Sequence, residues 1–381
     1  DTRVPTASLD RNCSPYPAIR EPIWDGDRIV FAVEDRGSSH VYGVLNDGSE
    51  EPRALVDGEL WITGYDVAGG EIVHTASTPT ALAEVYRGTT RLTEVGRSFT
   101  EARELVAPER FTATAPDGSE VEAWILRPAG FDPGRRYPVL LNIHGGPFTQ
   151  YGSQFFDEFQ VYAGAGYVVL YANPRGSSGY SEEWGRAIRG PAEGGPGMGT
   201  VDYDDLMAVV DEALSRFEFC DPDAMGVMGG SYGGFMTSWI VGRTDRFRAA
   251  CSERAVNNWI SDWGSSDLGW AFKGYIGAFL FEAPEAYERI SPTSAAQNIR
   301  TPLLIMHSEN DLRCDIEQGE HLFTILRLLK RPVEMVRFPA EGHELSRSGS
   351  PAHRVMRFEI LLDWFDRHLR SGPGAGVRAR R

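Results

Sequence analysis

The most informative stretch of the chain is AMGVMGGSYGGFMTSWIV, residues 224–241. It opens with a short apolar run, Ala224–Met228, which is typical of a buried strand, and Gly234–Val241 predicts the helix that follows. Between them, Gly229-Gly230-Ser231-Tyr232-Gly233 fits the pattern G-x-S-x-G. In that pattern a sharp strand-to-helix turn exposes the serine, and the turn needs glycines because its backbone angles are unusual and side chains would not fit. The flanking strand and helix favour a nucleophilic Ser231 over a spectator serine in a Gly-rich turn.

Similar apolar runs recur after Pro108, and stretches with apolar residues at helical spacing lie between them. Strands that alternate with helices predict an α/β domain, with a mostly parallel sheet and helices on both faces. A turn at Asp117-Gly118 also predicts a leading hairpin over Phe111–Arg127. The expected strands are Tyr137–Ile143, Tyr167–Ala172, Ala224–Met228, Pro302–His307 and Val333–Phe338, and the other expected helices are Val201–Leu214, Ile316–Leu329 and Val355–Leu369.

Residues 23–95 show short strands separated by turn residues instead. A weak internal echo relates Arg28–Ala32 to Glu71–Thr75 at an offset of 43 residues, within the period of roughly 40–50 residues of propeller blades. A generic antiparallel sheet is the alternative. We therefore divide the chain into a partial β-propeller of about two blades (1–107), an α/β domain (108–370) and a flexible tail (371–381). The expected strands of the first part are Arg28–Val33, His40–Leu45, Trp61–Val67, Glu71–Ala76 and Leu82–Arg87.

Composition excludes several classes of protein. The chain has 381 residues, 41% of them hydrophobic and 24% charged, which suits two or three domains with a buried core. Its formal net charge of −16 would repel a nucleic-acid backbone. Its longest apolar stretch, Val161–Ala172, falls short of the roughly 20 residues that a membrane helix needs. We expect neither nucleic acid nor membrane as a partner. The scattered cysteines Cys13, Cys220, Cys251 and Cys314 favour a reducing compartment, the cytoplasm, although one disulfide stays possible.

A serine hydroxyl becomes a strong nucleophile only when a base removes its proton and a further group orients that base. In a sheet with this type of turn, the acid and then the histidine follow the serine, each on a loop after a strand. Asp311 follows the strand Pro302–His307, and His343 follows Val333–Phe338. Glu309 is a competitor for the role of the acid, Asp315 more plausibly caps the next helix, and His307 is expected to be structural.

The negative oxygen of a tetrahedral intermediate needs fixed N–H donors. One should be the amide of Tyr232, directly after the serine, and the other should lie in His144-Gly145-Gly146-Pro147, directly after the strand Tyr137–Ile143. His144 as a zinc ligand is discarded, because no partner lies at ligand spacing. A further Gly-rich run, 194–199, lacks the ending of a phosphate-binding loop and is interpreted as a flexible surface loop.

Taken together, these motifs resemble the prolyl oligopeptidase family of serine peptidases, in particular its acylaminoacyl-peptidase and dipeptidyl-peptidase-like branch. The similarity runs in order across about 110–370 and is specific as a set. The matching pieces are His144-Gly145-Gly146-Pro147, Asn173-Pro174-Arg175-Gly176-Ser177-Ser178-Gly179-Tyr180, Gly229–Met236, Asn310-Asp311-Leu312-Arg313 and Gly342-His343.

The resemblance implies an α/β-hydrolase domain with Ser231, Asp311 and His343 as a catalytic triad, Gly146 and Tyr232 as oxyanion-hole amides, and no cofactor or metal. It also implies a preceding β-propeller that restricts access to short peptides. Because a propeller usually has about four to eight blades, we expect that the missing blades lie on another polypeptide, as a separate N-terminal chain, or were removed. A homo-oligomer is a further possibility.

Substrate contacts are harder to predict. Arg313 matches a position near the active site of acylaminoacyl peptidases, and a structural salt bridge is its alternative role. The aromatic segment Trp259–Phe281 could form a wall of an apolar pocket, although most of its rings are expected to pack in the core. We therefore take Arg313, Phe148 and Trp259 as candidate substrate-binding residues.

The resemblance implies a serine peptidase that hydrolyses short peptides or acyl- and aminoacyl-amides through an acyl-enzyme. An esterase or amidase that acts on small non-peptide substrates is one alternative, since the same triad serves both. A catalytically silent binding protein that uses its propeller is the other alternative.

Overall fold

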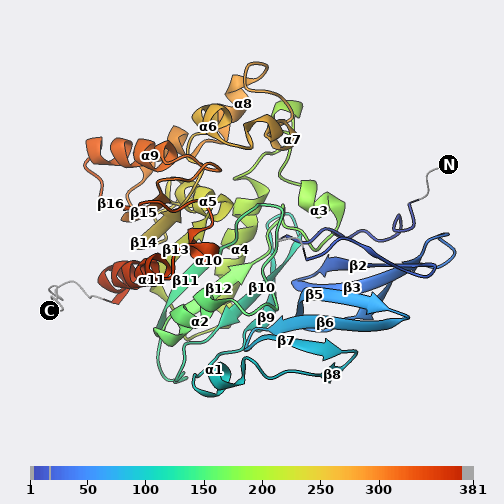
Figure 1. The fold of residues 1–381 in the computed structure, drawn as a ribbon. Coiled ribbons are helices and arrows are strands. Elements are labelled where there is room, and N and C mark those ends of the chain that lie inside the picture. The colour runs from blue at the N-terminus through green and yellow to red at the C-terminus, as the bar shows by residue number, and fades with distance from the viewer. Residues whose placement is uncertain (1–3, 17–18, 371–381) are drawn as a thin grey trace.

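The structure is a computed structural model, and it describes residues 4–16 and 19–370. Its strands form two separate eight-stranded sheets, one from each part of the chain, which lie side by side in Figure 1. The expected tail, 371–381, lies outside the described residues. Among the described residues, no helix is both long and apolar enough to cross a membrane.

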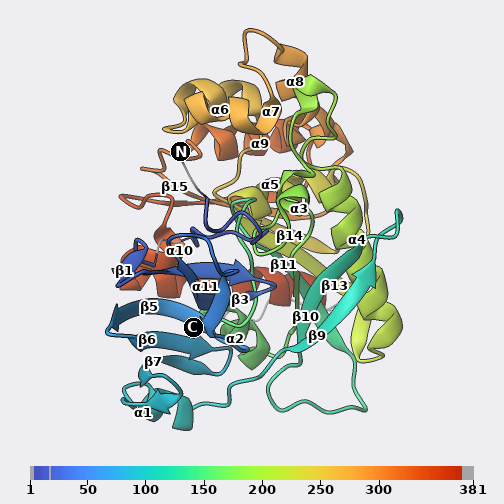
Figure 2. The ribbon, with the colours of Figure 1, turned by 90° about the vertical axis from the view of Figure 1, so that its right-hand side faces the viewer.

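The first sheet, which we call the β region, consists of two successive four-stranded antiparallel units (Figure 2). A single parallel pair, Ser39 with Trp61, joins them. The sequence echo relates equivalent strands, because Arg28 and Glu71 each begin the second strand of a unit. The strands are β1 (Ile23–Asp25), β2 (Arg28–Asp35), β3 (Ser38–Leu45), β4 (Arg53–Val56), β5 (Trp61–Ala68), β6 (Glu71–Thr78), β7 (Ala81–Arg87) and β8 (Thr90–Arg91).

The second sheet has the strand order β16-β15-β14-β13-β11-β12-β10-β9. The six strands from β16 to β12 are parallel, and β10 and β9 add the expected hairpin as an antiparallel edge. Sequence analysis missed β14, a strand of only five residues. The strands are β9 (Glu109–Thr114), β10 (Glu120–Leu126), β11 (Tyr137–Ile143), β12 (Val168–Ala172), β13 (Cys220–Gly230), β14 (Ala249–Glu253), β15 (Leu303–Ser308) and β16 (Val333–Phe338).

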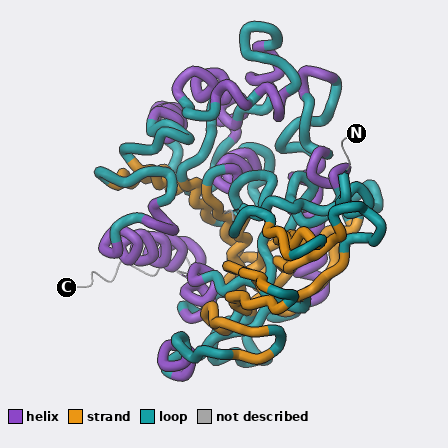
Figure 3. The backbone as a smooth tube through the Cα atoms, turned by 45° about the vertical axis from the view of Figure 1, so that its right-hand side comes forward, coloured by secondary structure: helices purple, strands orange, loops and turns teal. Residues whose placement is uncertain are grey.

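Helices cover both faces of this sheet, as predicted (Figure 3). Successive strand residues point to opposite faces, so that Leu141 packs with α4 and α5 whereas Leu140 packs with α2 and α11. Helix α11 begins four residues earlier than expected, because Ser350 caps it and Pro351 occupies its first turn. These helices are α2 (Asp157–Gly164), α4 (Val201–Arg216), α5 (Tyr232–Val241), α9 (Glu317–Leu328) and α11 (Pro351–Phe365).

Shorter helices fill the connections. A group of them between β14 and β15 gathers beyond α5 and α9, at the top of Figure 1. The group consists of α6 (Trp259–Ser265), η2 (Gly269–Ala271), α7 (Lys273–Ile276), α8 (Pro284–Arg289) and η3 (Pro292–Asn298). The others are α1 (Arg97–Glu101), α3 (Glu182–Arg186), η1 (Pro191–Glu193), α10 (Leu345–Ser348) and η4 (Asp366–Arg370).

Candidate active site

Ser231 lies at the sharp turn between β13 and α5, with φ of 61° and ψ of −121°. A positive φ is costly for a residue with a side chain and persists only where the surroundings hold it. Its N–H donates to the carbonyl oxygen of Glu253 on β14 at 2.9 Å, and its own carbonyl accepts from the N–H of Phe235 at 2.9 Å. The turn is tight, because a Cβ built on Gly233 would lie 2.0 Å from the carbonyl oxygen of Ile143.

Asp311 and His343 meet although 32 residues separate them. His343 Nδ1 lies 2.7 Å from Asp311 Oδ2. The other oxygen, Oδ1, accepts the N–H groups of Arg313 and Cys314, each at 2.9 Å. An ionised carboxylate can only accept, so Nδ1 carries the proton and Nε2 is left as the basic nitrogen.

Burial and hydrogen bonding oppose each other in this pair. Burial would raise the pKa of Asp311, but the hydrogen bond and charge of His343 outweigh it and leave the pKa below its ordinary value. Burial lowers the pKa of His343, and its hydrogen bond to Asp311 only partly compensates. Both shifts favour an ionised acid and a neutral histidine at neutral pH, which is the state a general base requires.

The three residues share one edge of the sheet. Strands β13, β15 and β16 run parallel within it, so the loops that follow them leave at the same edge. Ser231 begins the first of these loops, and Asp311 and His343 lie on the other two. His343 also acts electrostatically on Glu253, whose carbonyl binds the N–H of Ser231. Ser231 and His343 are both partly exposed, so a substrate can reach them.

The competing side chains have other partners. Glu309 pairs with Arg337 at 3.0 Å, so its carboxylate is not the one that meets His343. Asp315 lies one residue before Ile316, the N-cap of α9, and accepts the N–H of Glu317, the first residue of that helix. His307 is buried, and its Nε2 lies 2.8 Å from the carbonyl oxygen of Cys314, in agreement with a structural role.

The loop His144–Pro147 lies directly against the serine. A Cβ built on Gly145 would lie 3.5 Å from Ser231 Cβ, and Gly146 is exposed with φ of 113°. His144 is buried, with Nδ1 2.7 Å from the carbonyl oxygen of Gly145 and Nε2 2.9 Å from the Ser177 hydroxyl. Burial lowers its pKa to about 4, so it is a neutral support for the loop.

The other expected donor, Tyr232, is the first residue of α5. N–H groups in the first turn of a helix have no partner within it. The amide of Tyr232 directly follows Ser231, and the loop that contains Gly146 lies against Ser231. The two expected oxyanion-hole donors stay predictions.

The candidate substrate-binding residues have partners of their own. Arg313 forms an ion pair with Asp267 at 2.7 Å, which is the structural role left open above. Trp259 is buried and packs edge-on against Phe235 and Phe272. Phe148 is half-buried and fills the space beside Gly185. Their contact with substrate stays a prediction.

The aromatic segment as a whole is mixed in character. Phe272 is buried, as the core-packing alternative predicts, whereas Trp270 and Phe281 are exposed. The core-packing alternative therefore holds for Trp259 and Phe272 but not for Trp270 and Phe281, and a pocket wall stays a prediction.

The Gly-rich run 194–199 is not a surface loop along its whole length, which corrects the expectation. Met198 is buried, and a Cβ built on Gly199 would lie 2.3 Å from the indole of Trp239 on α5. Gly199 has φ of +81°, and its carbonyl accepts the indole N–H of Trp239 at 2.6 Å. Glycine is needed here for close packing against the nucleophile helix.

Sequence analysis missed Arg254, which belongs to no motif. Its φ is +41°, its side chain is buried, and it forms an ion pair with Glu253 at 3.3 Å. The guanidinium packs on Gly230, because a Cβ built there would lie 2.6 Å from its Cζ. Its charge adds to the burial that lowers the pKa of His343.

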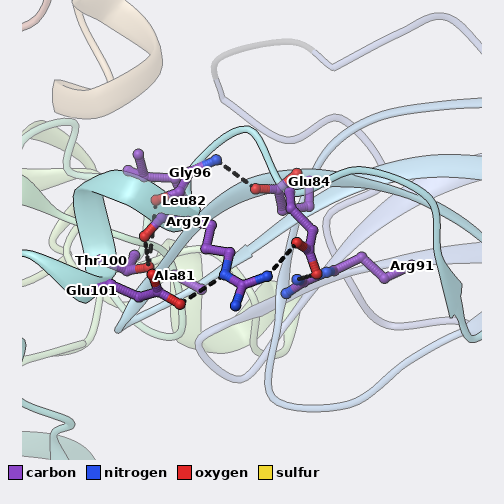
Figure 4. Close-up of a pocket in the computed structure, with 9 residues that line it drawn as sticks. Ala81, Leu82, Glu84, Arg91, Gly96, Arg97, Thr100 and Glu101 are labelled. Atoms are coloured by element: carbon purple, nitrogen blue, oxygen red, sulfur yellow. Dashed lines mark hydrogen bonds and ion pairs between the residues drawn. The ribbon is translucent and has the colours of Figure 1, made fainter.

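A cavity of about 390 Å³ lies away from these residues, in the β region between β7 and α1 (Figure 4). Its charged side chains already pair with one another or with backbone. Arg97 bonds Glu94 and Glu101, and Glu84 accepts the N–H of Gly96 at 2.6 Å. The cavity therefore offers no reason to place the chemistry there.

The nucleophile turn, the paired acid and histidine, and the sheet order define a protein of the α/β-hydrolase class. The chain belongs to the prolyl oligopeptidase family, which it matches over residues 153–372. It is 41% identical over 362 residues to the uncharacterised peptidase YuxL of Bacillus subtilis. The aligned region covers 92% of this chain and 54% of that protein. The chain spans about half the length of the curated relatives it matches.

Solved structures show the same architecture. An uncomplexed acylaminoacyl peptidase of Pyrococcus horikoshii is 28% identical, with a TM-score of 0.86, over 97% of this chain and 58% of that chain. An acylaminoacyl peptidase in complex with Z-Gly-Gly-Phe-chloromethyl ketone is also 28% identical, with a TM-score of 0.87, over 98% and 58% of the two chains. The similarity includes both sheets, so the prediction of an α/β-hydrolase domain preceded by a partial propeller is confirmed.

Proposed function

We propose that this chain is the catalytic part of a serine peptidase that hydrolyses short peptides or acyl- and aminoacyl-amides. The observation that carries the proposal is the 2.7 Å contact between His343 Nδ1 and Asp311 Oδ2, at the sheet edge where the Ser231 turn lies. Family membership supports it, and so does the peptide chloromethyl ketone bound to an acylaminoacyl peptidase of the same fold.

The mechanism follows from these positions. Ser231 Oγ attacks the scissile carbonyl while His343 Nε2 takes its proton, and Asp311 orients and stabilises the imidazolium. The N–H groups of Gly146 and Tyr232 bind the negative oxygen of the tetrahedral intermediate. The intermediate collapses, His343 returns the proton to the leaving amine, and water then hydrolyses the acyl-enzyme by the same route.

The two parts of the chain have separate roles in this proposal. Residues 108–370 form the catalytic domain, and the β region, within 1–107, limits access to it. A cytoplasmic location is part of the proposal, because the four cysteines, Cys13, Cys220, Cys251 and Cys314, are all free thiols.

Covalent labelling tests the assignment of the nucleophile. A fluorophosphonate probe should label the chain at Ser231, and Ser231→Ala should abolish both labelling and turnover. If folded wild-type protein stays unlabelled, the proposal of an enzyme is wrong, and the alternative of a catalytically silent binding protein is favoured.

Substrate comparison separates the peptidase from the esterase. We expect kcat/KM to be substantial on acyl-aminoacyl or aminoacyl anilides. Turnover of p-nitrophenyl esters with negligible turnover of every amide would contradict a peptidase.

A further inference from the structure

The Gly-rich run 194–199 is followed by helix α4, whose first turn contains a fully buried carboxylate. Asp202, the second residue of α4, has 0% of its surface exposed. Its Oδ1 accepts the N–H groups of Thr200 at 2.7 Å and Tyr203 at 3.1 Å, and its Oδ2 accepts the N–H of Gly199 at 3.0 Å. Backbone on three sides therefore fixes the carboxylate in place.

The fourth donor to this carboxylate comes from the active site. The hydroxyl of Tyr232 donates to Asp202 Oδ2 at 2.6 Å, although the two residues are 30 apart in sequence. Burial raises the pKa of Asp202 to about 6, whereas the hydrogen bonds from Tyr232 and from the three backbone N–H groups favour the ionised form. A hydrogen bond to an ionised acceptor is shorter and stronger than a neutral one.

The ring of Tyr232 also lies near the histidine beside the other proposed oxyanion-hole donor. Its centroid lies 6.2 Å from that of His144, the residue that supports the Gly145–Gly146 loop. The side chain of Tyr232 thus lies between the Asp202 carboxylate and this loop, while its backbone supplies the other N–H donor.

We propose that Asp202 is a positioning residue for the oxyanion hole, which acts by holding the Tyr232 hydroxyl and thereby the backbone amide beside Ser231. The inference rests on the proposed function. Ser231 has a positive φ, a strained conformation that persists only where surrounding contacts hold it. If the turn relaxed, the N–H of Tyr232 would point in a different direction, so a residue that fixes the Tyr232 side chain also fixes this N–H.

The consequence concerns the transition state more than substrate binding. An oxyanion donor contacts charge that develops only during the reaction, so a misplaced donor lowers kcat and leaves KM nearly unchanged. Loss of one whole donor costs about 100- to 1,000-fold in kcat. We expect a displaced donor to cost less, about 10- to 100-fold.

The test uses two substitutions. Tyr232→Phe deletes only the hydroxyl. Asp202→Asn replaces one of the two accepting carboxylate oxygens with an NH2 group, which cannot accept a hydrogen bond. Both should lower kcat on an acyl-aminoacyl anilide about 10- to 100-fold, with KM within about twofold. The double variant should lose little more than Asp202→Asn alone, because the two changes break the same contact.

The matched control is Tyr167→Phe. Tyr167 lies just before β12, outside the nucleophile turn; its ring is buried, and its hydroxyl donates at 2.5 Å to Asp366 of η4. Tyr167→Phe should leave kcat unchanged, so that a loss in Tyr232→Phe reports on the nucleophile turn and not on the removal of any tyrosine hydroxyl.

Three results would overturn the inference. One is a Tyr232→Phe kcat within twofold of the control, another is a loss confined to KM, and the third is additive losses in the double variant. If Asp202→Asn does not fold, the comparison of kcat between Tyr232→Phe and Tyr167→Phe still tests the inference. Failure of fluorophosphonate to label the wild type would instead overturn the proposed function, and this inference with it.

Discussion

At the residue scale, each oxygen of Asp311 has a separate task. Oδ1 accepts two backbone N–H groups, which fix the carboxylate, and Oδ2 is left for His343. The hydrogen bond and charge of His343, together with the N–H of Cys314, outweigh the effect of burial, so the pKa of Asp311 stays below its ordinary value. The neighbouring Glu309 is exposed to solvent and pairs with Arg337. Among the described residues, no backbone N–H groups fix its carboxylate as they fix that of Asp311.

Asp311→Asn should lower kcat about 10,000-fold, because an amide N–H facing His343 Nδ1 forces the wrong tautomer while the shape is kept. Steady-state kinetics on an acyl-aminoacyl anilide measures the loss. Glu309→Gln is the control and should keep kcat within about twofold, since surface changes have small effects. Equal losses in the two variants would mean that Asp311 is not the acid.

At the scale of elements, the close approach of α5 to β11 positions the nucleophile. Gly233 lies on the first turn of α5, and a Cβ there would meet the carbonyl oxygen of Ile143 at 2.0 Å and that of His144 at 2.9 Å. Both obstacles are backbone, and the second belongs to the oxyanion loop. The helix can therefore come this close to the strand only because the residue is glycine.

Gly233→Ala should destabilise the protein by about 3 kcal/mol or more, because overpacking against backbone cannot relax through a side chain. Urea unfolding followed by circular dichroism measures the change in free energy. Gly264→Ala is the matched control, because a Cβ built at this position in α6 has no atom of the described residues within 4 Å apart from its chain neighbours and its own helix backbone. It should be neutral or stabilise by up to about 1 kcal/mol. Equal midpoints for Gly233→Ala and wild type would contradict the packing argument.

At the scale of the whole molecule, the turn between β2 and β3 docks the β region onto the loop that follows the oxyanion residues. Gln150 accepts the N–H of Gly37 and donates to the carbonyl of Ser38, both at 2.8 Å. The N–H of Ser153 donates to the carbonyl of Gly37 at 2.7 Å. Beside this contact, the buried Glu122 on β10 pairs with Arg36 of the turn at 2.6 Å.

Glu122→Gln should weaken this docking by about 1–3 kcal/mol, because Arg36 and Arg110 both pair with the same carboxylate oxygen. Thermal unfolding and proteolysis of the connection over 92–108 should both report it. Glu101→Gln, which breaks the exposed pair with Arg97 on α1, should change stability by less than about 0.5 kcal/mol. Similar effects of the two substitutions would contradict a special role for Glu122.

The same variant has a pH signature. Burial would raise the pKa of Glu122, but its hydrogen bonds to Arg110, Tyr180 and Arg36 outweigh that and lower it. A folded pKa below the unfolded value adds stability above the unfolded pKa, which is lost as the pH falls through the folded one. The difference between wild type and Glu122→Gln should therefore shrink below about pH 4.3.

Local sequence was enough to predict several parts of this protein. The apolar run before Ser231 and the glycines around it predict a strand, a tight turn and a helix, because all three signals lie within 18 residues. The echo between Arg28 and Glu71 likewise identifies equivalent strands of the β region. Strand β14 was missed because five residues give too short an apolar signal.

The sequence alone therefore determined the α/β class, the two-part organisation, and the candidates Ser231, Asp311 and His343. Tertiary structure alone decided that Asp311 rather than Glu309 faces His343, that Arg313 pairs with Asp267, and that Tyr232 reaches Asp202. The physical reason is range. Propensity and periodicity act over a few residues, whereas these contacts join residues 30 to 46 apart, and their partners are fixed only when the sheet brings the loops together.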